Sequence, residues 1–512
     1  MFSKRPITWS IGCCFLSLSL GATIAWAGDP VLTVKSGNQA QLAVDPNRTI
    51  RAKLPRTLFS ANMQYTQFDL RHWDKNAARV KPQVISALKP QSGAFYRYPG
   101  GLASNTHLWE ASVEPYATRL ANRKKGQSVT ANTLFGVDEY LDFISEVSEG
   151  QPWYTLNLLG SGTTNNPTEW SESEIATNNE NLAKYLVART PGIATRYYQL
   201  GNELDRNHFQ WPHSKYVSRS LASINKILLH DPSARFVPFM REFNWTYKAP
   251  KTGVSTAANY FKDVMTGLPM VKDFSLHFYF DGRLSPNNIF VTVPDVVTRI
   301  EKAVGLAKSA RNDDYNVWIT EYGKRFFLSG GVPESGTSFD AALGVADLLI
   351  ATSQMPVVKG AFMQGLDGGS RNFFYDSNTP TSAASAIRIL AGQPYTRVLA
   401  SQTTSPNKSG YAGGYDVRAV ALTNDVGDKL GVNAVNRSGS GTTLKVVNPR
   451  MAGKTVQHKR YVVKAPTGSN PKFVEKNFQV WGNPASSTKR FSNNGTIYLW
   501  LPPLSISSFT LD

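Results

Sequence analysis

The sequence predicts an α/β fold, a (β/α)8 TIM barrel with an appended C-terminal all-β sandwich domain. Three observations support this prediction. Strand-like apolar runs alternate with helix-period segments between residues 56 and 393. After Gly392 the pattern changes to short alternating strands, separated by turns rich in Gly, Asn and Ser. The chain has 512 residues and is 41% hydrophobic, which is enough to bury one large and one smaller core.

Eight apolar runs have the length and composition of buried barrel strands. They lie at residues 57–60, 94–98, 153–157, 197–200, 236–239, 274–279, 316–320 and 360–364. Helical periodicity is clearest between them at residues 77–88, 175–187, 214–229, 296–308 and 339–352. Trp153 and Trp318 fall inside the strand-like runs, so we expect both in the barrel core.

The C-terminal domain is expected to contain strands of a different kind, short and with alternating polarity. They lie at residues 415–422, 445–447, 478–481, 496–500 and 505–511. Two N-terminal runs at 31–34 and 41–44 have the same alternation and are expected to join them. The predicted organisation is a signal peptide at 1–27, N-terminal strands at 28–55, the barrel at 56–393 and the sandwich at 394–512. No low-complexity linker separates barrel and sandwich, which favours a packed interface.

The N-terminus has the pattern of an export signal. Lys4 and Arg5 precede an apolar stretch at residues 11–24, and Ala25-Trp26-Ala27 is a small-residue cleavage site. A membrane anchor is the alternative, but the stretch is shorter than the roughly 20 residues that a spanning helix needs. We therefore expect a secreted or periplasmic protein without a stable membrane anchor. Both cysteines lie inside this segment, so the mature chain is expected to form no disulfide.

The formal net charge of the chain is +18, which predicts affinity for anionic partners. Nucleic acid, anionic lipid and acidic polysaccharide all meet this criterion. The sequence has no RNP, zinc-finger or basic-helix pattern, and its basic residues are scattered, so nucleic acid is the less favoured partner. The oligomeric state is left open.

Two glutamates stand where strand-like runs break into polar and Gly-rich sequence. Glu203 ends Leu200-Gly201-Asn202-Glu203, and Glu321 ends Ile319-Thr320-Glu321. In a (β/α) barrel the carboxyl ends of the strands form the reactive face, so we expect the two carboxylates to meet there. A facing pair of carboxylic acids at such a face indicates glycoside hydrolysis.

These two motifs resemble those of the large clan of retaining (β/α)8 glycoside hydrolases. The resemblance implies that Glu203 is the acid/base and Glu321 the nucleophile. Residues 276–283 and 362–364 resemble the heparanase and β-glucuronidase family, whereas Arg97-Tyr98-Pro99-Gly100-Gly101 followed by Trp109 is closer to the arabinofuranosidase and β-xylosidase families. Many members carry a Trp at the end of strand eight where this chain has Gln364 and Gly365, which leans towards the heparanase-like branch.

The resemblance also implies roles for the surrounding side chains. Asn202 would bind the 2-hydroxyl of the sugar, Arg97 and Tyr279 would hold Glu321 in place, and His277 would shape the floor of the site. A purely structural role for His277 remains an alternative. Gln364 and Trp109 are further candidates for contact with substrate.

Basic residues near the predicted strand ends are candidates for binding an acidic substrate. Lys324 and Arg325 directly follow the strand of Glu321, and residues 123–125 are Arg-Lys-Lys in the loop between strands two and three. Arg and Lys there would suit uronic carboxylates or sulfates, although a solvated basic surface is the alternative. His208 and His213 lack a third ligand, so no metal is predicted, and no cofactor is required.

The predicted mechanism depends on the separation of the two carboxyl groups. Retention of anomeric configuration requires about 5 to 5.5 Å between them. At an effective dielectric near 20, two such charges repel by about 3 kcal/mol. This repulsion would raise the pKa of the glutamate that loses its proton second, Glu203, from about 4.3 towards 6 or 7.

The main hypothesis is a secreted retaining β-glycoside hydrolase that cleaves an acidic polysaccharide internally, with a uronic acid-containing or sulfated glycan as substrate. One alternative is an exo-acting arabinofuranosidase- or xylosidase-like enzyme on neutral glycans, which residues 97–101 favour. The other is a noncatalytic polysaccharide-binding protein on a hydrolase scaffold.

Overall fold

The computed structural model describes most of the chain from residue 31 to residue 512. The described residues are 31–37, 39–125, 128, 132–148, 151–163, 165–205, 209, 211–240, 257–280, 292–324, 327–329, 332–334, 339–366, 373–374, 379–407, 414–465 and 479–512. Within these ranges no helix combines the length and the apolar content that crossing a bilayer requires.

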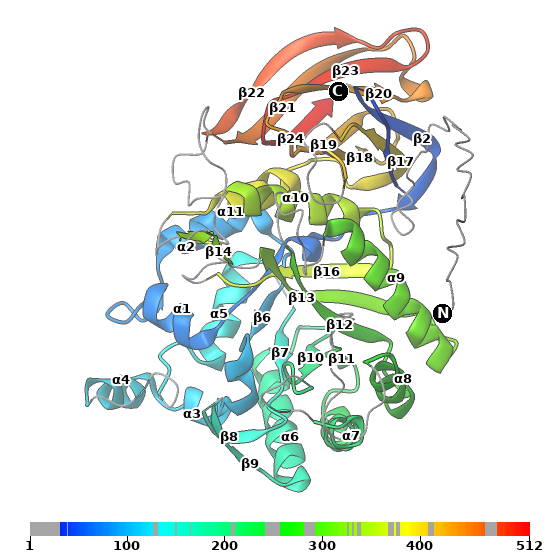
Figure 1. Cartoon of the computed structure of the whole chain (residues 1–512). Helices are drawn as coiled ribbons and strands as arrows, with labels where there is room; N and C mark the ends of the chain where they lie inside the picture. The colour runs from blue at the N-terminus through cyan, green and yellow to red at the C-terminus, as the bar shows by residue number, and fades with distance from the viewer. Residues whose placement is uncertain are drawn as a thin grey trace, which may run out of the picture.

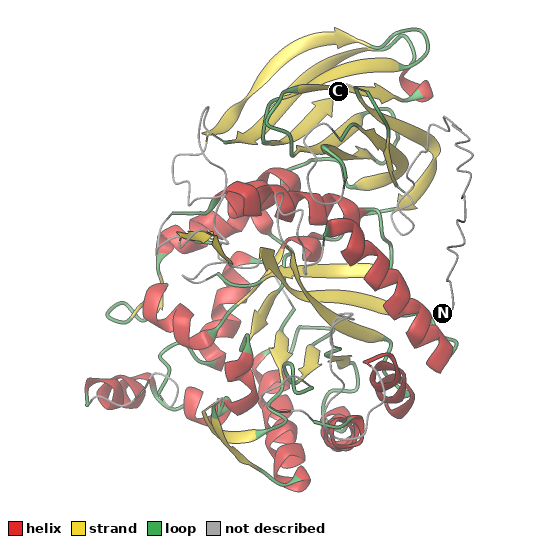
Figure 2. Ribbon diagram, viewed as in Figure 1, coloured by secondary structure: helices red, strands yellow, loops and turns green. Residues whose placement is uncertain are grey.

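Eight parallel strands form the barrel (Figures 1 and 2). In chain order they are β3 (Ser60–Asn62), β6 (Tyr96–Tyr98), β7 (Trp153–Thr155), β10 (Tyr197–Leu200), β11 (Arg235–Pro238), β12 (Asp273–Phe280), β13 (Asn316–Lys324) and β16 (Val358–Met363). They pair in the order β11-β10-β7-β6-β3-β16-β13-β12. A parallel bridge between Phe239 and Ser275 joins β11 to β12, which closes the ring and confirms the predicted fold class.

Each barrel strand is followed by one helix of the outer layer. These helices are α2 (Pro82–Leu88), α5 (Val137–Val147), α6 (Glu172–Arg189), α7 (His213–Leu228), α8 (Ala257–Gly267), α9 (Val293–Ala310), α10 (Phe339–Ser353) and α11 (Ser382–Ala391). Local sequence explains where several of them begin. The side chains of Ser171, Thr292 and Thr381 each accept a hydrogen bond from a backbone N–H of the first turn.

Smaller elements lie in the loops of the barrel. They are η1 (Arg56–Phe59), α1 (Tyr65–Arg71), β4 (Trp73–Asp74), β5 (Arg79–Val80), η2 (Lys89–Gln91), η3 (Leu102–Thr106), α3 (Trp109–Ser112), α4 (Tyr116–Lys124), β8 (Gly160–Thr163), β9 (Asn166–Glu169), β14 (Phe327–Ser329) and β15 (Val332–Glu334). Because of these elements, one strand and one helix begin later than the sequence predicted. The first strand begins at Ser60 because residues 56–59 form a 3-10 turn, and the helix expected from residue 77 begins at Pro82 because Arg79–Val80 pairs with Trp73–Asp74.

Aromatic side chains fill the lower part of the barrel. Trp153, Trp318 and Phe362 form a buried cluster with Phe95 and Val237, so both tryptophans lie in the core as predicted. The Trp318 ring stacks on Phe95 at a centroid distance of 6.1 Å, and the Trp153 ring meets Trp318 edge-on at 4.8 Å. This layer seals the barrel from below, so any reactive groups in it must stand above the aromatic residues.

A ten-stranded, mainly antiparallel sheet forms the second domain. Its strands are β1 (Leu32–Val34), β2 (Ala40–Arg51), β17 (Arg397–Ser405), β18 (Val417–Thr423), β19 (Leu430–Asn436), β20 (Thr442–Val447), β21 (Thr455–Lys464), β22 (Gln479–Arg490), β23 (Thr496–Leu501) and β24 (Ser505–Leu511), with the short helix η4 (Pro449–Met451). Strand β2 pairs with β17 and β20, so the N-terminal strands belong to this sheet. The sheet curls around its own apolar core, because β23 also contacts β19 and β24.

Helices α10 and α11 lie between the barrel strands and the β-domain (Figure 1). Every residue of α10 is buried, since one side packs on the barrel and the other on β18 and β19. A buried ion pair crosses the interface, where Arg418 Nε of β18 donates to Asp347 Oδ1 of α10 at 2.6 Å. Tyr415 also donates a hydrogen bond to Asp347. The two domains are therefore joined by an interface that is both packed and charge-matched.

Removal of one partner from this ion pair should destabilise the whole protein. We expect Asp347→Ala to lower the free energy of unfolding by about 3–5 kcal/mol, because it leaves the buried Arg418 charge uncompensated. Urea denaturation would measure this change. The control is Asp314→Ala, whose partner Lys308 is 49% exposed and which should change the free energy of unfolding much less. Equal effects of the two substitutions would contradict the importance of the interface.

Candidate active site

A polar layer stands directly above the aromatic layer of the barrel. Strand side chains alternate, so the residue two positions after each aromatic residue also faces inward. Two residues after Phe95 and Tyr197 stand Arg97 and Gln199, both fully buried. Polar side chains at these depths must be hydrogen-bonded, which concentrates polar chemistry at the carboxyl ends of the strands.

Glu203 lies in a tight turn that follows strand β10. Gly201 has φ +70°, and a Cβ at this position would lie 2.6 Å from Leu204 Cδ1. Glu203 itself has φ +54°, a left-handed conformation that is uncommon for a residue with a side chain. Asn105 of η3 holds the turn, since Asn202 N–H donates to Asn105 Oδ1 at 2.9 Å and Asn105 Nδ2 donates to Asn202 O at 2.6 Å. Strain of this kind occurs at functional sites.

Glu321 faces the barrel interior because strand β13 contains a bulge. Opposite strand β12, Leu276 pairs with Ile319 and His277 pairs with Glu321, so Thr320 is the extra residue. A regular strand would place Thr320 and Glu321 on opposite faces. The bulge re-aims the strand so that Thr320 contacts His277 and Glu321 contacts Arg97.

The turn and the bulge bring the two carboxyl groups together. One oxygen each of Glu203 and Glu321 and one ring nitrogen of His277 all lie within 4.8 Å of one another. Both glutamates are buried, with 5% and 3% of their surfaces exposed. This separation lies in the range of retaining glycosidases and is too short for the water that inverting enzymes place between their carboxyl groups.

Arg97 connects the parts of this site. Its guanidinium donates to Gln199 Oε1 at 2.7 Å, Asn62 Oδ1 at 2.6 Å and Glu321 Oε1 at 3.1 Å, and it also donates to Asn202 Oδ1. Burial lowers the pKa of Arg97, and the neighbouring Glu321 and Glu203 carboxylates oppose this effect. An arginine stays protonated even so, and it supplies a fixed positive charge beside Glu321.

Tyr279 and His277 complete the contacts of the two carboxylates. The Tyr279 hydroxyl donates a hydrogen bond to Glu321 Oε2. His277 Nδ1 lies 2.6 Å from Glu203 Oε1 and 3.5 Å from Glu321 Oε2, while its Nε2 lies 3.1 Å from Thr320 Oγ1. The Phe239 ring packs against the imidazole at a centroid distance of 4.3 Å. The imidazole is thus held between the two acids in one orientation.

The carboxylate–histidine–carboxylate set also has the donor atoms of a metal site. The Arg97 guanidinium, however, is already bound to Glu321, and its positive charge opposes a cation at that oxygen. The arrangement fits an acid/base and nucleophile pair better than a metal centre.

Solved structures of glycoside hydrolases match nearly the whole chain. An arabinofuranosidase matches with a TM-score of 0.70 at 14% identity, over 93% of this chain and 100% of its own. The alpha-L-arabinofuranosidase of Thermotoga maritima matches with 0.68 at 14%, over 92% and 99%. A Paenibacillus polymyxa xyloglucanase of glycoside hydrolase family 44 matches with 0.58 at 12%, over 93% and 100%. This chain therefore shares their fold.

Sequence comparison gives a shorter match. No family model matches the chain. Over 176 residues it is 26% identical to the intracellular exo-alpha-(1->5)-L-arabinofuranosidase of Streptomyces lividans, which covers 32% of this chain and 26% of that protein. The chain thus spans about a quarter of the length of the curated relative that it matches. These matches do not support the expected closeness to the heparanase and β-glucuronidase family.

The remaining predicted site residues are less closely placed. Gln364 directly follows strand β16, and its backbone N–H donates to Tyr322 O at 3.0 Å, which puts it at the same end of the barrel. Lys324 is the last residue of β13 and its side chain is not described; Arg325 and His208 lie outside the described residues. His213 lies at the start of α7, with Nδ1 3.6 Å from Asp263 Oδ2.

Trp109 was expected to contact substrate, but the structure places it elsewhere. It is buried in α3, its indole N–H donates to Asn178 O at 3.3 Å and its ring packs on Tyr185, both on helix α6. Trp211 is also buried, with Lys215 and Arg219 over its ring. Both tryptophans hold loops onto helices.

Four residues of the site were not predicted from the sequence. Asn62, Gln199, Asn105 and Thr320 all form hydrogen bonds with predicted site residues. Alternation along strands β10 and β13 would have found Gln199 and Thr320, because each follows an inward aromatic residue by two positions. Asn62 and Asn105 lie outside the strand-like runs and carried no such signal.

Loss of the Asn105 side chain, which holds the turn that contains Glu203, should lower both stability and activity. Asn105→Ala removes two hydrogen bonds of the Asn202 backbone in a buried setting, so we expect a cost of about 1–3 kcal/mol in unfolding free energy. The rate constant kcat should fall with little change in KM, because the turn positions Glu203. Asn122→Ala, which breaks a partly exposed contact with Asn132, is the control and should leave kcat unchanged. An unchanged kcat in Asn105→Ala would contradict the positioning role.

Proposed function

We propose that this protein is a glycoside hydrolase that cleaves its substrate by double displacement with retention of configuration. The observation that carries this proposal is the pair of buried carboxyl groups within 4.8 Å at the carboxyl ends of β10 and β13. The (β/α)8 fold shared with solved glycosidases supports it.

The first step would form a covalent intermediate. The Glu321 carboxylate attacks the anomeric carbon as the glycosidic C–O bond breaks, and the leaving oxygen takes the proton of Glu203. In the second step Glu203, now a carboxylate, takes a proton from water. The water oxygen bonds to the anomeric carbon, the ester bond to Glu321 breaks and both glutamates return to their starting states.

The surrounding contacts suit these two roles. Arg97 and Tyr279 each hold one oxygen of Glu321, which fixes the carboxylate for attack. His277 holds Oε1 of Glu203 at 2.6 Å, which orients the carboxyl group for proton transfer. Since Arg97 binds Asn202 Oδ1, the amide must present its Nδ2 group to a ligand, which suits donation to a sugar hydroxyl.

For the substrate we propose an arabinose-containing neutral glycan that is cleaved from its end. The support is the exo-arabinofuranosidase activity for which the Streptomyces lividans relative is named, together with the similar structures, which are arabinofuranosidases. The Arg97 to Gly101 segment, which resembles these families, provides the central hydrogen-bonding residue of the site. This choice replaces the acidic polysaccharide as the leading substrate hypothesis.

Substitution of each glutamate should separate the two roles. With 4-nitrophenyl α-L-arabinofuranoside, Glu321→Gln should lower kcat by about 10³-fold or more. Glu203→Gln should lower kcat by about 10²–10⁴-fold for a sugar leaving group and much less for nitrophenolate, which needs no acid. Glu146→Gln, an exposed position on α5, is the control. NMR of the first product should show the anomeric configuration of the substrate. An inverted product, or normal turnover by Glu321→Gln, would overturn the proposal.

An acidic polysaccharide remains the second candidate because of the loops that follow the first two barrel strands. Residues 63–81 and 99–136 together contain eight Lys or Arg and four Asp or Glu.

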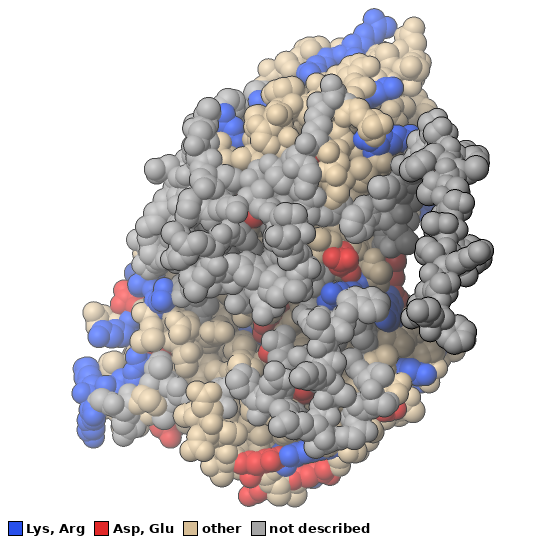
Figure 3. All heavy atoms as spheres, viewed as in Figure 1, with Lys and Arg blue, Asp and Glu red and all other residues tan. Residues whose placement is uncertain are grey.

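 Figure 3 shows Lys and Arg side chains gathered around the projecting helix α4, where Lys124 and Lys125 are exposed. Loops at this end of a barrel border its active site, so a basic excess there would favour an anionic chain.

Salt dependence should distinguish the two substrate classes. If the substrate is an acidic polysaccharide, kcat/KM should fall several-fold between 0.02 and 0.5 M NaCl, because screening removes the attraction of the basic loops. If it is a neutral arabinan, kcat/KM should stay nearly constant. Reducing-end release from both polymers, compared with release by Glu321→Gln, gives the measurement. Turnover of neither polymer with retained binding would favour a noncatalytic binding protein.

We further propose that the protein is exported with removal of residues 1–27. The support is sequence alone, from the Lys4 and Arg5 pair, the apolar stretch and the Ala25-Trp26-Ala27 site. N-terminal sequencing of the protein recovered outside the cytoplasm should begin at Gly28. A protein that keeps Met1 or the apolar stretch would overturn this proposal.

A further inference from the structure

Strand β23 presents two aromatic side chains to solvent at the edge of the β-domain sheet. Ile497, Leu499 and Leu501 point into the apolar core, so the residues between them point outward. Tyr498 is 52% and Trp500 is 50% exposed. Among the described residues these are the aromatic side chains that fall in the exposed class. Neighbouring exposed apolar side chains that form a patch mark interaction sites on protein surfaces.

The Trp500 ring rests against Gly441, which directly precedes strand β20. A Cβ at Gly441 would overlap the six-membered ring of Trp500, so only glycine allows the indole to lie there. The six-membered ring of the indole thus lies close to Gly441, while half of the side chain remains open to solvent. Because Tyr498 and Trp500 are two positions apart on one strand, their attachment points are separated by roughly 7 Å. One extended ligand can therefore contact both rings.

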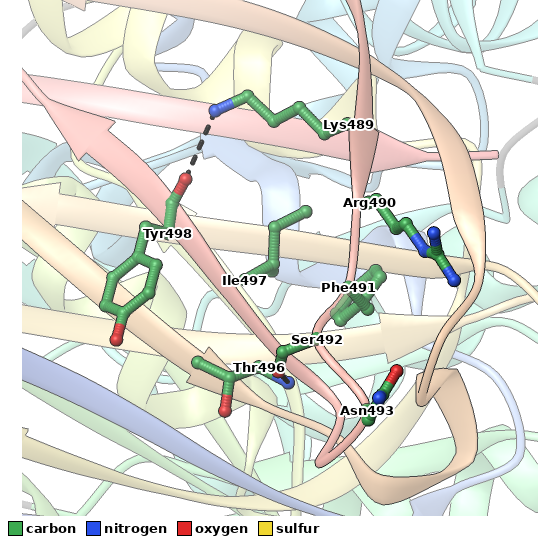
Figure 4. Close-up of a pocket in the computed structure, with 8 residues that line it drawn as sticks. All are labelled: Lys489, Arg490, Phe491, Ser492, Asn493, Thr496, Ile497 and Tyr498. Atoms are coloured by element: carbon green, nitrogen blue, oxygen red, sulfur yellow. Dashed lines mark hydrogen bonds between the residues drawn. The ribbon is translucent and has the colours of Figure 1, made fainter.

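Basic side chains surround the two aromatic residues. Lys445 of β20 stands directly opposite Tyr498. Lys489 Nζ donates to Tyr498 O at 3.2 Å, and Arg460 Nη1 donates to Trp500 O at 3.3 Å. Figure 4 shows Lys489 reaching toward the Tyr498 backbone across a hollow that residues 489–493 and 496–498 line. We call Lys445, Arg460, Lys489, Tyr498 and Trp500 the β23 face.

The charge of this part of the chain favours an anionic ligand. Residues 441–512 contain ten Lys or Arg and two Asp or Glu. The β23 face also lies at the outer end of the β-domain, and helices α10 and α11 separate that domain from the barrel strands (Figure 1). It is therefore distinct from the site of Glu203 and Glu321.

We propose that the β23 face binds an acidic polysaccharide chain. The sugar rings would stack on Tyr498 and Trp500, whose flat faces match the apolar faces of pyranose rings. Uronic carboxylates or sulfates would pair with Lys445, Lys489 and Arg460. This inference goes beyond the proposed hydrolysis, because binding here needs neither glutamate.

Binding by the full chain tests the proposal. With the Glu321→Gln protein, which should not degrade its ligand, we expect isothermal titration to detect polygalacturonate at low salt. The double substitution Tyr498→Ala and Trp500→Ala should raise Kd at least about tenfold. Lys445→Ala should raise Kd less and should reduce its salt dependence. Leu229→Ala, which removes a 68% exposed side chain from the barrel, is the control and should leave Kd unchanged.

Hydrolysis of a small aryl glycoside should be the same with or without Tyr498 and Trp500, provided the melting temperatures agree. If hydrolysis is absent in every protein but the aromatic substitutions still weaken polygalacturonate binding, the proposed function fails and the β23 face stands. An unchanged Kd in the double variant would overturn this inference. If the double substitution weakens binding of neutral arabinan, a single-stranded oligonucleotide or anionic vesicles more than binding of polygalacturonate, the inference is also overturned.

Discussion

The hydrogen bonds of the Arg97 guanidinium link strand β6 to β3, to β10 and to β13 across the interior of the barrel. Burial of an unpaired guanidinium costs several kcal/mol, and only well-placed acceptors offset that cost. Those acceptors converge only when the barrel is closed and the turn after β10 is formed. The two carboxyl groups are therefore brought into position by the same contacts that close the barrel.

Strand alternation and strand ends were sufficient to predict much of this arrangement. Glu203, Glu321, Arg97, His277 and Tyr279 all lie at or near predicted strand ends, and the structure brings them together. The bulge in β13 could not be predicted from the sequence. A regular two-residue alternation would place Glu321 and Thr320 on opposite faces of the strand. Trp109 shows a second limit of prediction from sequence. The sequence does not distinguish a tryptophan that stacks on a sugar from one that packs on a helix, as Trp109 does.

The β-domain is fixed to the barrel by α10, which is buried on all sides, and by the Asp347–Arg418 pair. Its position relative to the carboxyl groups is consequently set by folding and not by a flexible tether. In the β-domain, core-facing residues of β23 are aliphatic while the outward ones are aromatic, so one strand both builds the core and forms a surface. A polysaccharide bound at the β23 face would therefore stay close to the barrel domain.

The most direct test of the account is to trap the intermediate that Glu321 is proposed to form. A 2-deoxy-2-fluoro glycoside with a good leaving group should react faster than its ester is hydrolysed, so mass spectrometry of the intact protein should show one added glycosyl group. Peptide mapping should place that group on Glu321, and Glu321→Gln should remain unmodified. A glycosyl group on another residue, or an active enzyme that never acquires one, would contradict the account.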